Sequence, residues 1–90
     1  MYNIKITPGA ERDIGKLRQR ISRQDFERLR SAITSLADEP RPPGVKKIKG
    51  GERVYRIRVG SYRIVYQLYD DEQQVVIVEI ARRTESTYRS

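Results

Sequence analysis

Two hydrophobic periodicities divide the chain. Between residues 7 and 36, apolar side chains recur at steps of three and four, which is the spacing of one face of an α-helix. The two stripes are Ala10, Ile14, Leu17 and Ile21, and then Phe26, Leu29, Ile33 and Leu36. From Val45 onward the spacing changes to two, and β-branched and aromatic residues dominate. The pattern predicts helices followed by a sheet.

Local signals place the ends of these elements. Residues 2–6 alternate as a short first strand, and Thr7 followed by proline is a typical start of a helix. Ser22 is placed to cap a second helix, so the two stripes predict an antiparallel helical hairpin. Residues 38–44 contain three prolines and a glycine, which end the second helix and exclude a central strand there.

A tight turn predicts the register of a β-hairpin. Val54–Val59 and Tyr62–Tyr69 are separated by Gly60-Ser61, a pair that suits a type II′ turn. Val59 then faces Tyr62, and Arg58 faces Arg63. The side that the helices should cover carries Tyr55, Ile57, Val59, Tyr62, Ile64, Tyr66 and Leu68. The other side carries Arg56, Arg58, Arg63, Gln67 and Tyr69.

A last strand is expected over residues 75–81. Regular alternation would place Val76, Val78 and Ile80 on one side and Val75, Ile77, Glu79 and Ala81 on the other. Both sides are largely apolar, which indicates a central strand. The sequence thus predicts a single α+β domain over residues 1–90, with an N-terminal strand and a two-helix hairpin packed on a small, mostly antiparallel sheet.

Composition narrows the classes of function. The 90 residues include no cysteine and no histidine, so we expect neither a metal centre nor a cofactor. No apolar run approaches the roughly eighteen residues of a membrane span, and the N-terminus lacks the pattern of a signal peptide. We therefore expect a cytoplasmic protein without a membrane partner.

The net charge of +7 favours a polyanionic partner. Residues 41–69 hold eight basic side chains and one acidic, so most of the excess lies in the middle of the chain. A charge run of this kind can also be an ordinary solvated surface. The placement of the charges in the hairpin is more informative.

Arg58 opposite Arg63 is an unfavourable cross-strand pair, because like charges repel. Glu79 would relieve the repulsion internally if it shares their face, and solvation of the arginine stems is the other plain explanation. Arginine forks match phosphate geometry, however, and three lysines precede the strand: Lys46, Lys47 and Lys49. The sequence therefore predicts a phosphate-binding face.

The stretch from Lys46 to Arg89, with GSYRIVYQ at residues 60–67 and an arginine-rich tail ending in Tyr-Arg, resembles the C-terminal half of RelE toxins. The strand and helical hairpin before it fit the order of elements in that family. The resemblance implies a metal-independent endoribonuclease that cuts messenger RNA in the ribosomal A site and inhibits translation. In that reaction the ribose 2′-hydroxyl attacks the adjacent phosphorus, leaving a cyclic phosphate and a free 5′-hydroxyl.

The resemblance also assigns roles to residues. Arg63 matches the arginine that stabilises the transition state, and Arg83 matches a second one, with Arg82 in that place if the tail register shifts. The implied catalytic residues are Arg56, Arg58, Arg63, Arg83 and Tyr88. The implied RNA-binding residues are Lys46, Lys47, Lys49, Arg82 and Arg89. Tyr88 would stack on the RNA or orient it, although a surface aromatic near a terminus is the alternative.

The resemblance is incomplete at the general base. Arg56 and Arg58 stand where well-studied relatives carry lysines, and arginine does not lose its proton under ordinary conditions. Proton transfer would then fall to Glu79, Glu85 or Tyr88, or the reaction would rely on electrostatics and positioning.

The resemblance implies three partners. They are a RelB-like antitoxin, messenger RNA, and the ribosome with its 16S rRNA in the A site. An acidic or amphipathic antitoxin segment would wrap the helical hairpin and cover the basic face, and the complex would bind operator DNA through the antitoxin. Two alternatives stay open: a ParE-like inhibitor of DNA gyrase, and an RNA- or ribosome-binding module without catalysis, such as a toxin that has lost its activity.

Overall fold

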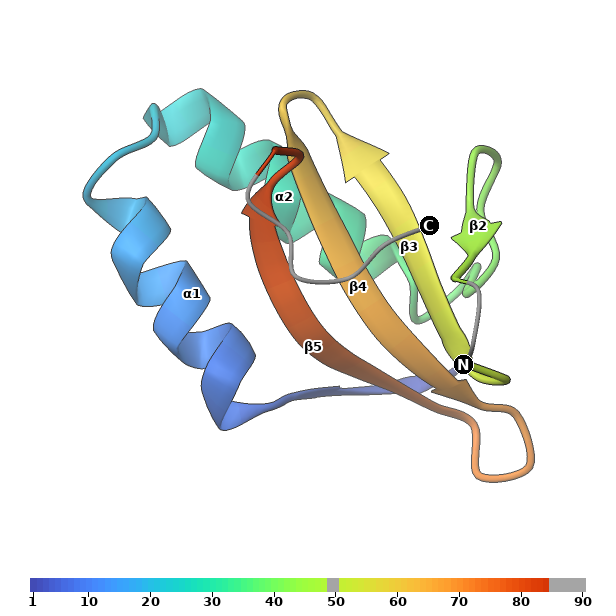
Figure 1. The fold of residues 1–90 in the computed structure, drawn as a ribbon. Helices are drawn as coiled ribbons and strands as arrows, with labels where there is room; N and C mark the ends of the chain where they lie inside the picture. The colour runs from blue at the N-terminus through green and yellow to red at the C-terminus, as the bar shows by residue number, and fades with distance from the viewer. Residues whose placement is uncertain (49–50, 85–90) are drawn as a thin grey trace.

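The computed structural model describes residues 1–48 and 51–84, and Figure 1 shows the arrangement of its elements. Their bounds in chain order are β1 Asn3–Ile6, α1 Pro8–Arg18, α2 Arg23–Ser35, β2 Lys46–Lys47, β3 Val54–Val59, β4 Tyr62–Tyr69 and β5 Gln74–Arg82. No helix in this part of the chain is long and apolar enough to cross a bilayer.

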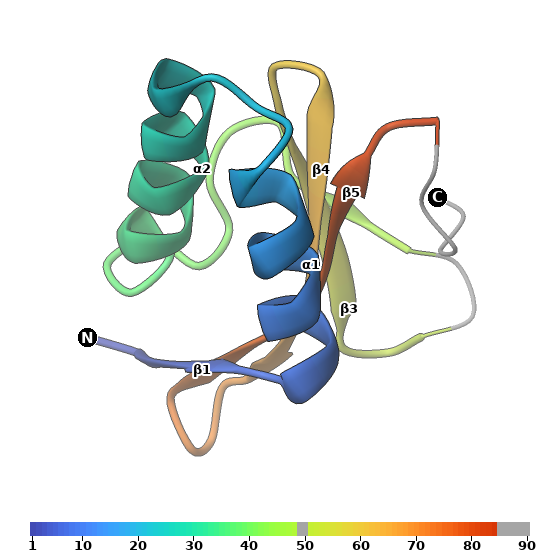
Figure 2. The same cartoon turned by 90° about the vertical axis from the view of Figure 1, so that its left-hand side faces the viewer.

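The strands form one sheet in the order β1-β5-β4-β3-β2. β1 runs parallel to β5, and the other neighbouring pairs are antiparallel. Both helices lie on the same face of this sheet (Figure 2). The predicted α+β fold, with a helical hairpin on a mostly antiparallel sheet, is confirmed.

Both helices begin at the predicted residues. The Thr7 hydroxyl accepts a hydrogen bond from the Ala10 N–H at 3.1 Å, and the Ser22 hydroxyl accepts one from the Asp25 N–H at 3.1 Å. These caps satisfy N–H groups that the first helical turn leaves without partners. α1 is shorter than the apolar stripe suggested, since it ends at Arg18, yet Ile21 beyond it still packs against the core.

The predicted hairpin register is confirmed, with Val59 opposite Tyr62 and Arg58 opposite Arg63. Gly60 has a φ of 59°, whereas Ser61 is not among the residues with positive φ, as a type II′ turn requires. The face beneath the helices is the core, where Ile64 and Tyr66 are fully buried. The register set by this turn therefore places the apolar side chains on one face of the hairpin and the arginines on the other.

β5 corrects the prediction of regular alternation. The register shifts between Val65, which faces Glu79, and Tyr66, which faces Ile77, so Val78 has no counterpart on β4. This β-bulge reverses the facing of every residue after it. Ile77 and Ile80 consequently share the core face, while Glu79 lies on the face opposite the helices.

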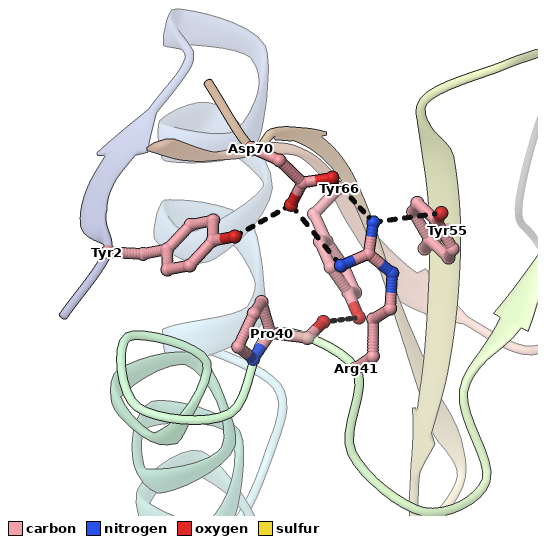
Figure 3. Close-up of polar contacts among 6 residues, drawn as sticks. All are labelled: Tyr2, Pro40, Arg41, Tyr55, Tyr66 and Asp70. Atoms are coloured by element: carbon pink, nitrogen blue, oxygen red, sulfur yellow. Dashed lines mark hydrogen bonds and ion pairs between the residues drawn. The ribbon is translucent and has the colours of Figure 1, made fainter. Parts of the chain in front are cut away.

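The loop after α2 is tied to the sheet by a buried tyrosine. The Tyr66 hydroxyl donates to the Pro40 carbonyl at 2.7 Å, and burial raises the pKa of that hydroxyl (Figure 3). The proline-rich segment thereby gains a fixed contact with the centre of β4 before it continues to β2.

Asp70, at the end of β4, joins three further segments (Figure 3). Its carboxylate accepts from the Tyr2 hydroxyl at 2.7 Å and from the Arg41 guanidinium at 2.8 Å and 3.2 Å. Arg41 also donates to the Tyr55 hydroxyl at 3.3 Å. One cluster therefore joins the N-terminus, the proline-rich loop, β3 and the β4–β5 turn.

Two glycine substitutions should change stability in opposite directions. Gly60→Ala places a side chain at a positive φ and should lower the free energy of unfolding by about 1 kcal/mol. Gly15→Ala lies inside α1 with nothing within 4 Å of the added Cβ, and should raise it by about 0.5–1 kcal/mol. Urea unfolding of both variants measures the two effects; equal signs would contradict the turn assignment.

The Asp70 cluster predicts a pH dependence of stability. Hydrogen bonds from Arg41 and Tyr2 lower the pKa of Asp70 from 3.8 to about 2. A carboxyl whose pKa is lower in the folded state stabilises that state above its unfolded pKa, and this contribution is lost as the pH falls from about 4 to 2. Asp70→Asn should therefore flatten the fall of the urea midpoint across this range.

The neighbouring substitution Asp71→Asn is the matched control, because Asp71 makes none of these contacts. It should keep the wild-type slope of the urea midpoint. An unchanged slope in Asp70→Asn would show that the cluster is not maintained in solution.

Candidate nucleic-acid interface

The face of the sheet away from the helices gathers arginines from β3 and β4. The hairpin register places Arg58 directly opposite Arg63, and Arg56 opposite Val65, on this face. Arg58 is exposed, Arg63 is half-buried and Arg56 is only 3% exposed. These three side chains, together with Arg83, are called the arginine cluster below.

Arg56 is the unusual member of the arginine cluster. Burial lowers the pKa of its guanidinium, and the positive charges of Arg58, Arg63 and Arg83 lower it further. Its Nε has no hydrogen-bond partner in the described part of the chain. Val65 opposite it is also buried, so the base of the cluster is apolar and screens the charges poorly. An anion at this point would gain more than on an open surface.

Arg83 joins the arginine cluster through the end of β5. Its backbone N–H donates to the Ser61 carbonyl at 3.0 Å, which ties the tail to the hairpin turn. Ala81 faces Arg63, whereas Arg82 faces Tyr62 and so takes the register position of the helix-covered side. The positive charge of Arg83 also contributes to lowering the pKa of the Arg56 guanidinium.

A shallow pocket lies between the turn and the tail. Ser61, Arg63, Arg82, Arg83 and Thr84 line it. Arg82 thus borders the same pocket as Arg63 and Arg83, although its register position in β5 is that of the helix-covered face. The pocket offers guanidinium groups to a ligand placed beside the arginine cluster.

The lysines before β3 are divided between the two faces. Lys46 pairs with Arg56 and lies on the arginine face, but Lys47 pairs with Tyr55 and lies on the other. Successive strand residues point to opposite sides, so Lys47 does not share the face of the arginines, and its predicted contact with RNA stays a prediction. Three of the predicted site residues lie outside the described residues: Lys49, Tyr88 and Arg89.

Glu79 reaches the arginine face only because of the β5 bulge, which simple alternation does not predict. It is the one acidic residue within the strands that the structure describes. A signal in the sequence was available: Ile77 and Ile80 are three residues apart, so both can enter the core only if the strand gains a residue between them.

The arrangement is suited to binding phosphate and to stabilising extra negative charge on it. Guanidinium groups stay protonated, donate in a planar fork and neutralise a pentacoordinate phosphorane. The described residues contain no group of three side chains placed to hold a metal ion.

A second surface lies on the helical side of the molecule. An apolar groove of about 350 Å³ runs between the two helices, β1 and β5, and Leu17, Phe26 and Ile33 are among its lining residues. Ile6 at its border is 37% exposed. The groove and the arginine cluster lie on opposite faces of the sheet, so two ligands could occupy them at once.

Comparisons with known proteins agree with this geometry. A family model of the ParE toxin of the type II toxin–antitoxin system parDE matches residues 4–87. The toxin RelE of Mycobacterium tuberculosis is 32% identical over 85 residues, which cover 94% of this chain and 84% of that protein.

Two solved structures share the fold. The archaeal RelE–RelB complex from Pyrococcus horikoshii OT3 matches with a TM-score of 0.76 and 23% identity, covering 94% of this chain and 98% of that one. The toxin–antitoxin complex RelBE2 from Mycobacterium tuberculosis matches with a TM-score of 0.73 and 25% identity, covering 91% of this chain and 98% of that one.

The burial of Arg56 predicts that its charge destabilises the free protein. Arg56→Met should raise the free energy of unfolding by about 1 kcal/mol or more, because it removes a desolvated cation from among three others. Arg58→Met removes the same charge from an exposed position and should raise it less. Thermal unfolding at low salt compares the two; a less stable Arg56→Met protein would contradict this account.

Proposed function

We propose that this chain, which belongs to the RelE family of type II toxin–antitoxin toxins, is a ribosome-dependent endoribonuclease that cleaves messenger RNA in the ribosomal A site. The observation that carries the proposal is the arginine cluster, in which a buried guanidinium is surrounded by three others. Repulsion of this kind is costly in the free protein. Glu79 lies on the same face, as the internal explanation requires, but it supplies one carboxylate against four guanidinium groups, and a phosphate ligand would relieve more of the repulsion. A cluster of like charges that costs folding energy is explained if its ligand is the phosphate of an RNA substrate.

In the proposed reaction the 2′-oxygen attacks the adjacent phosphorus, the bond to the 5′-oxygen breaks, and a cyclic phosphate forms. Arg63 and Arg83 border the pocket beside the hairpin turn, where they would neutralise the phosphorane. Arg56 and Arg58 would hold the flanking phosphates, and Lys46 would extend this basic surface. No step of this scheme requires a metal ion.

Proton transfer needs a group other than arginine, which stays protonated. Glu79 lies on the same face of the sheet as the arginine cluster, and its carboxylate is a suitable acceptor for the proton of the 2′-hydroxyl. The leaving 5′-oxygen must in turn gain a proton to become the free 5′-hydroxyl. Glu85 and Tyr88 are the other candidates that the sequence offers for these two transfers, and both lie outside the described residues.

The proposed regulatory partner is a RelB-like antitoxin. Relatives of this fold have been crystallised as RelE–RelB and RelBE2 complexes. The apolar groove beside the helices suits the apolar side of an amphipathic antitoxin segment, and an acidic portion of the same segment would complement the basic face. Operator DNA would be bound through the antitoxin of the complex.

A second candidate function is inhibition of DNA gyrase, because the matching family model describes a ParE toxin. That activity needs no phosphate-binding cluster on the sheet. The two functions make different predictions for the same arginine substitution, so one experiment separates them.

Arg63→Ala should abolish RNA cleavage, with a fall of about 100-fold or more, because it removes a cation that stabilises the transition state. The fold should largely persist, since the Arg63 side chain lies on the face away from the core. The measurement is growth after induction in bacteria, together with mapping of 5′-hydroxyl ends on translated messages.

Arg28→Ala is the matched control, since it removes the same charge from an exposed position on α2 and should leave cleavage intact. Growth arrest with intact messages and damaged DNA would support the gyrase function instead. Absence of arrest in the wild type, with RNA binding retained, would indicate a binding module without catalysis.

A further inference from the structure

β5 extends past the end of its parallel neighbour. β1 pairs with β5 only from Gln74 to Ile77, and the Thr7 N–H donates to the Ile77 carbonyl at 3.0 Å where the chain turns into α1. β5 continues to Arg82, so within residues 1–48 and 51–84 no strand pairs with this edge of its second half. Backbone groups at a partly buried edge need other partners.

Asp13 on α1 supplies one of these partners. Its Oδ2 accepts a hydrogen bond from the Ile80 N–H at 3.0 Å, in a partly buried position. The carboxylate thus takes the place that a carbonyl of β1 would occupy if that strand were longer. The contact joins the helical layer to β5 two residues after Val78, the extra residue of the bulge.

This hydrogen bond depends on the bulge. The carbonyls of Gln73 and Ile77 point toward β1, where they accept from Asn3 and Thr7. In a regular strand residue 79 would be the next to point that way, because backbone groups alternate between the two edges. The bulge moves this role to Ile80, whose N–H then meets Asp13, and it turns the Glu79 side chain away from the core.

We propose that Asp13 is a positioning residue that holds the β5 bulge in the register that presents Glu79 on the arginine face. The functional consequence rests on the proposed nuclease: there Glu79 accepts the 2′-hydroxyl proton while the 2′-oxygen forms its bond to phosphorus. Asp13 would act on that step from the opposite layer of the molecule, without contacting RNA.

The first test measures the geometry without using activity. In Asp13→Ala the Ile80 N–H loses its acceptor, and its hydrogen exchange should become about tenfold faster relative to the Leu68 amide, which donates to the Arg53 carbonyl away from the bulge. Asp13→Asn keeps a side-chain oxygen as acceptor and should remain near the wild-type ratio. Glu11→Ala removes a charge from an exposed position on the same helix and is the control.

The second test measures the consequence for cleavage. Asp13→Ala should lower kcat with little change in KM, since the arginine cluster is untouched, and Asp13→Asn should restore most of the rate. In a Glu79→Gln background, Asp13→Ala should cause no further fall, because the two residues act through the same carboxylate. If Asp13→Ala lowers kcat by the same factor in the wild-type chain and in the Glu79→Gln variant, Asp13 has only a general structural role and the inference is overturned.

The two tests separate this inference from the proposed function. An unchanged ratio of Ile80 to Leu68 exchange in Asp13→Ala overturns the inference even if the wild-type chain is an active nuclease. A wild-type chain that cuts no message contradicts the proposed function, while the exchange ratio still decides whether Asp13 accepts from the Ile80 N–H in solution.

Discussion

The two-residue turn at Gly60 and Ser61 is the constraint on which the rest of the structure depends. Its geometry pairs Val59 with Tyr62, and every later pair in the hairpin follows from that one. Side chains alternate along a strand, so the same register that gathers the apolar residues under the helices also gathers arginines on the opposite face. Core formation and charge accumulation are thus two results of one backbone geometry.

The arginine cluster lowers the stability of the sheet locally. Apolar burial across the helix-covered face offsets the repulsion within the arginine cluster, whose buried member is desolvated as well as surrounded by like charge. The strands fix the face and the register from which the arginine side chains of β3 and β4 extend. A phosphate that bound there, as proposed, would meet a backbone whose ordering is already completed during folding.

The contacts between layers explain how so small a sheet keeps this arrangement. The Tyr66 hydroxyl binds the Pro40 carbonyl and the Asp70 carboxylate binds Arg41, so two contacts hold the proline-rich loop against the end of β4 (Figure 3). Asp13 performs a similar task at the other edge, where it replaces the strand that β5 lacks. Each of these groups joins residues far apart in the chain, so the faces of the sheet are held by long-range polar contacts as well as by the hydrophobic core.

The sequence by itself determined both helices, four of the five strands, the helix caps and the hairpin register, because each depends on near neighbours: Thr7 and Ser22 at the caps, and Gly60 at the turn. The short edge strand β2 was not predicted. Only the tertiary structure decided which face Glu79 and Lys47 occupy, how deeply Arg56 is buried, and which backbone group Asp13 satisfies. Those features arise from packing between layers and from a bulge that lets Ile77 and Ile80 enter the same core. The three-residue spacing of Ile77 and Ile80 is compatible with an extra residue in the strand, but only the partner strand and the covering helix select that arrangement.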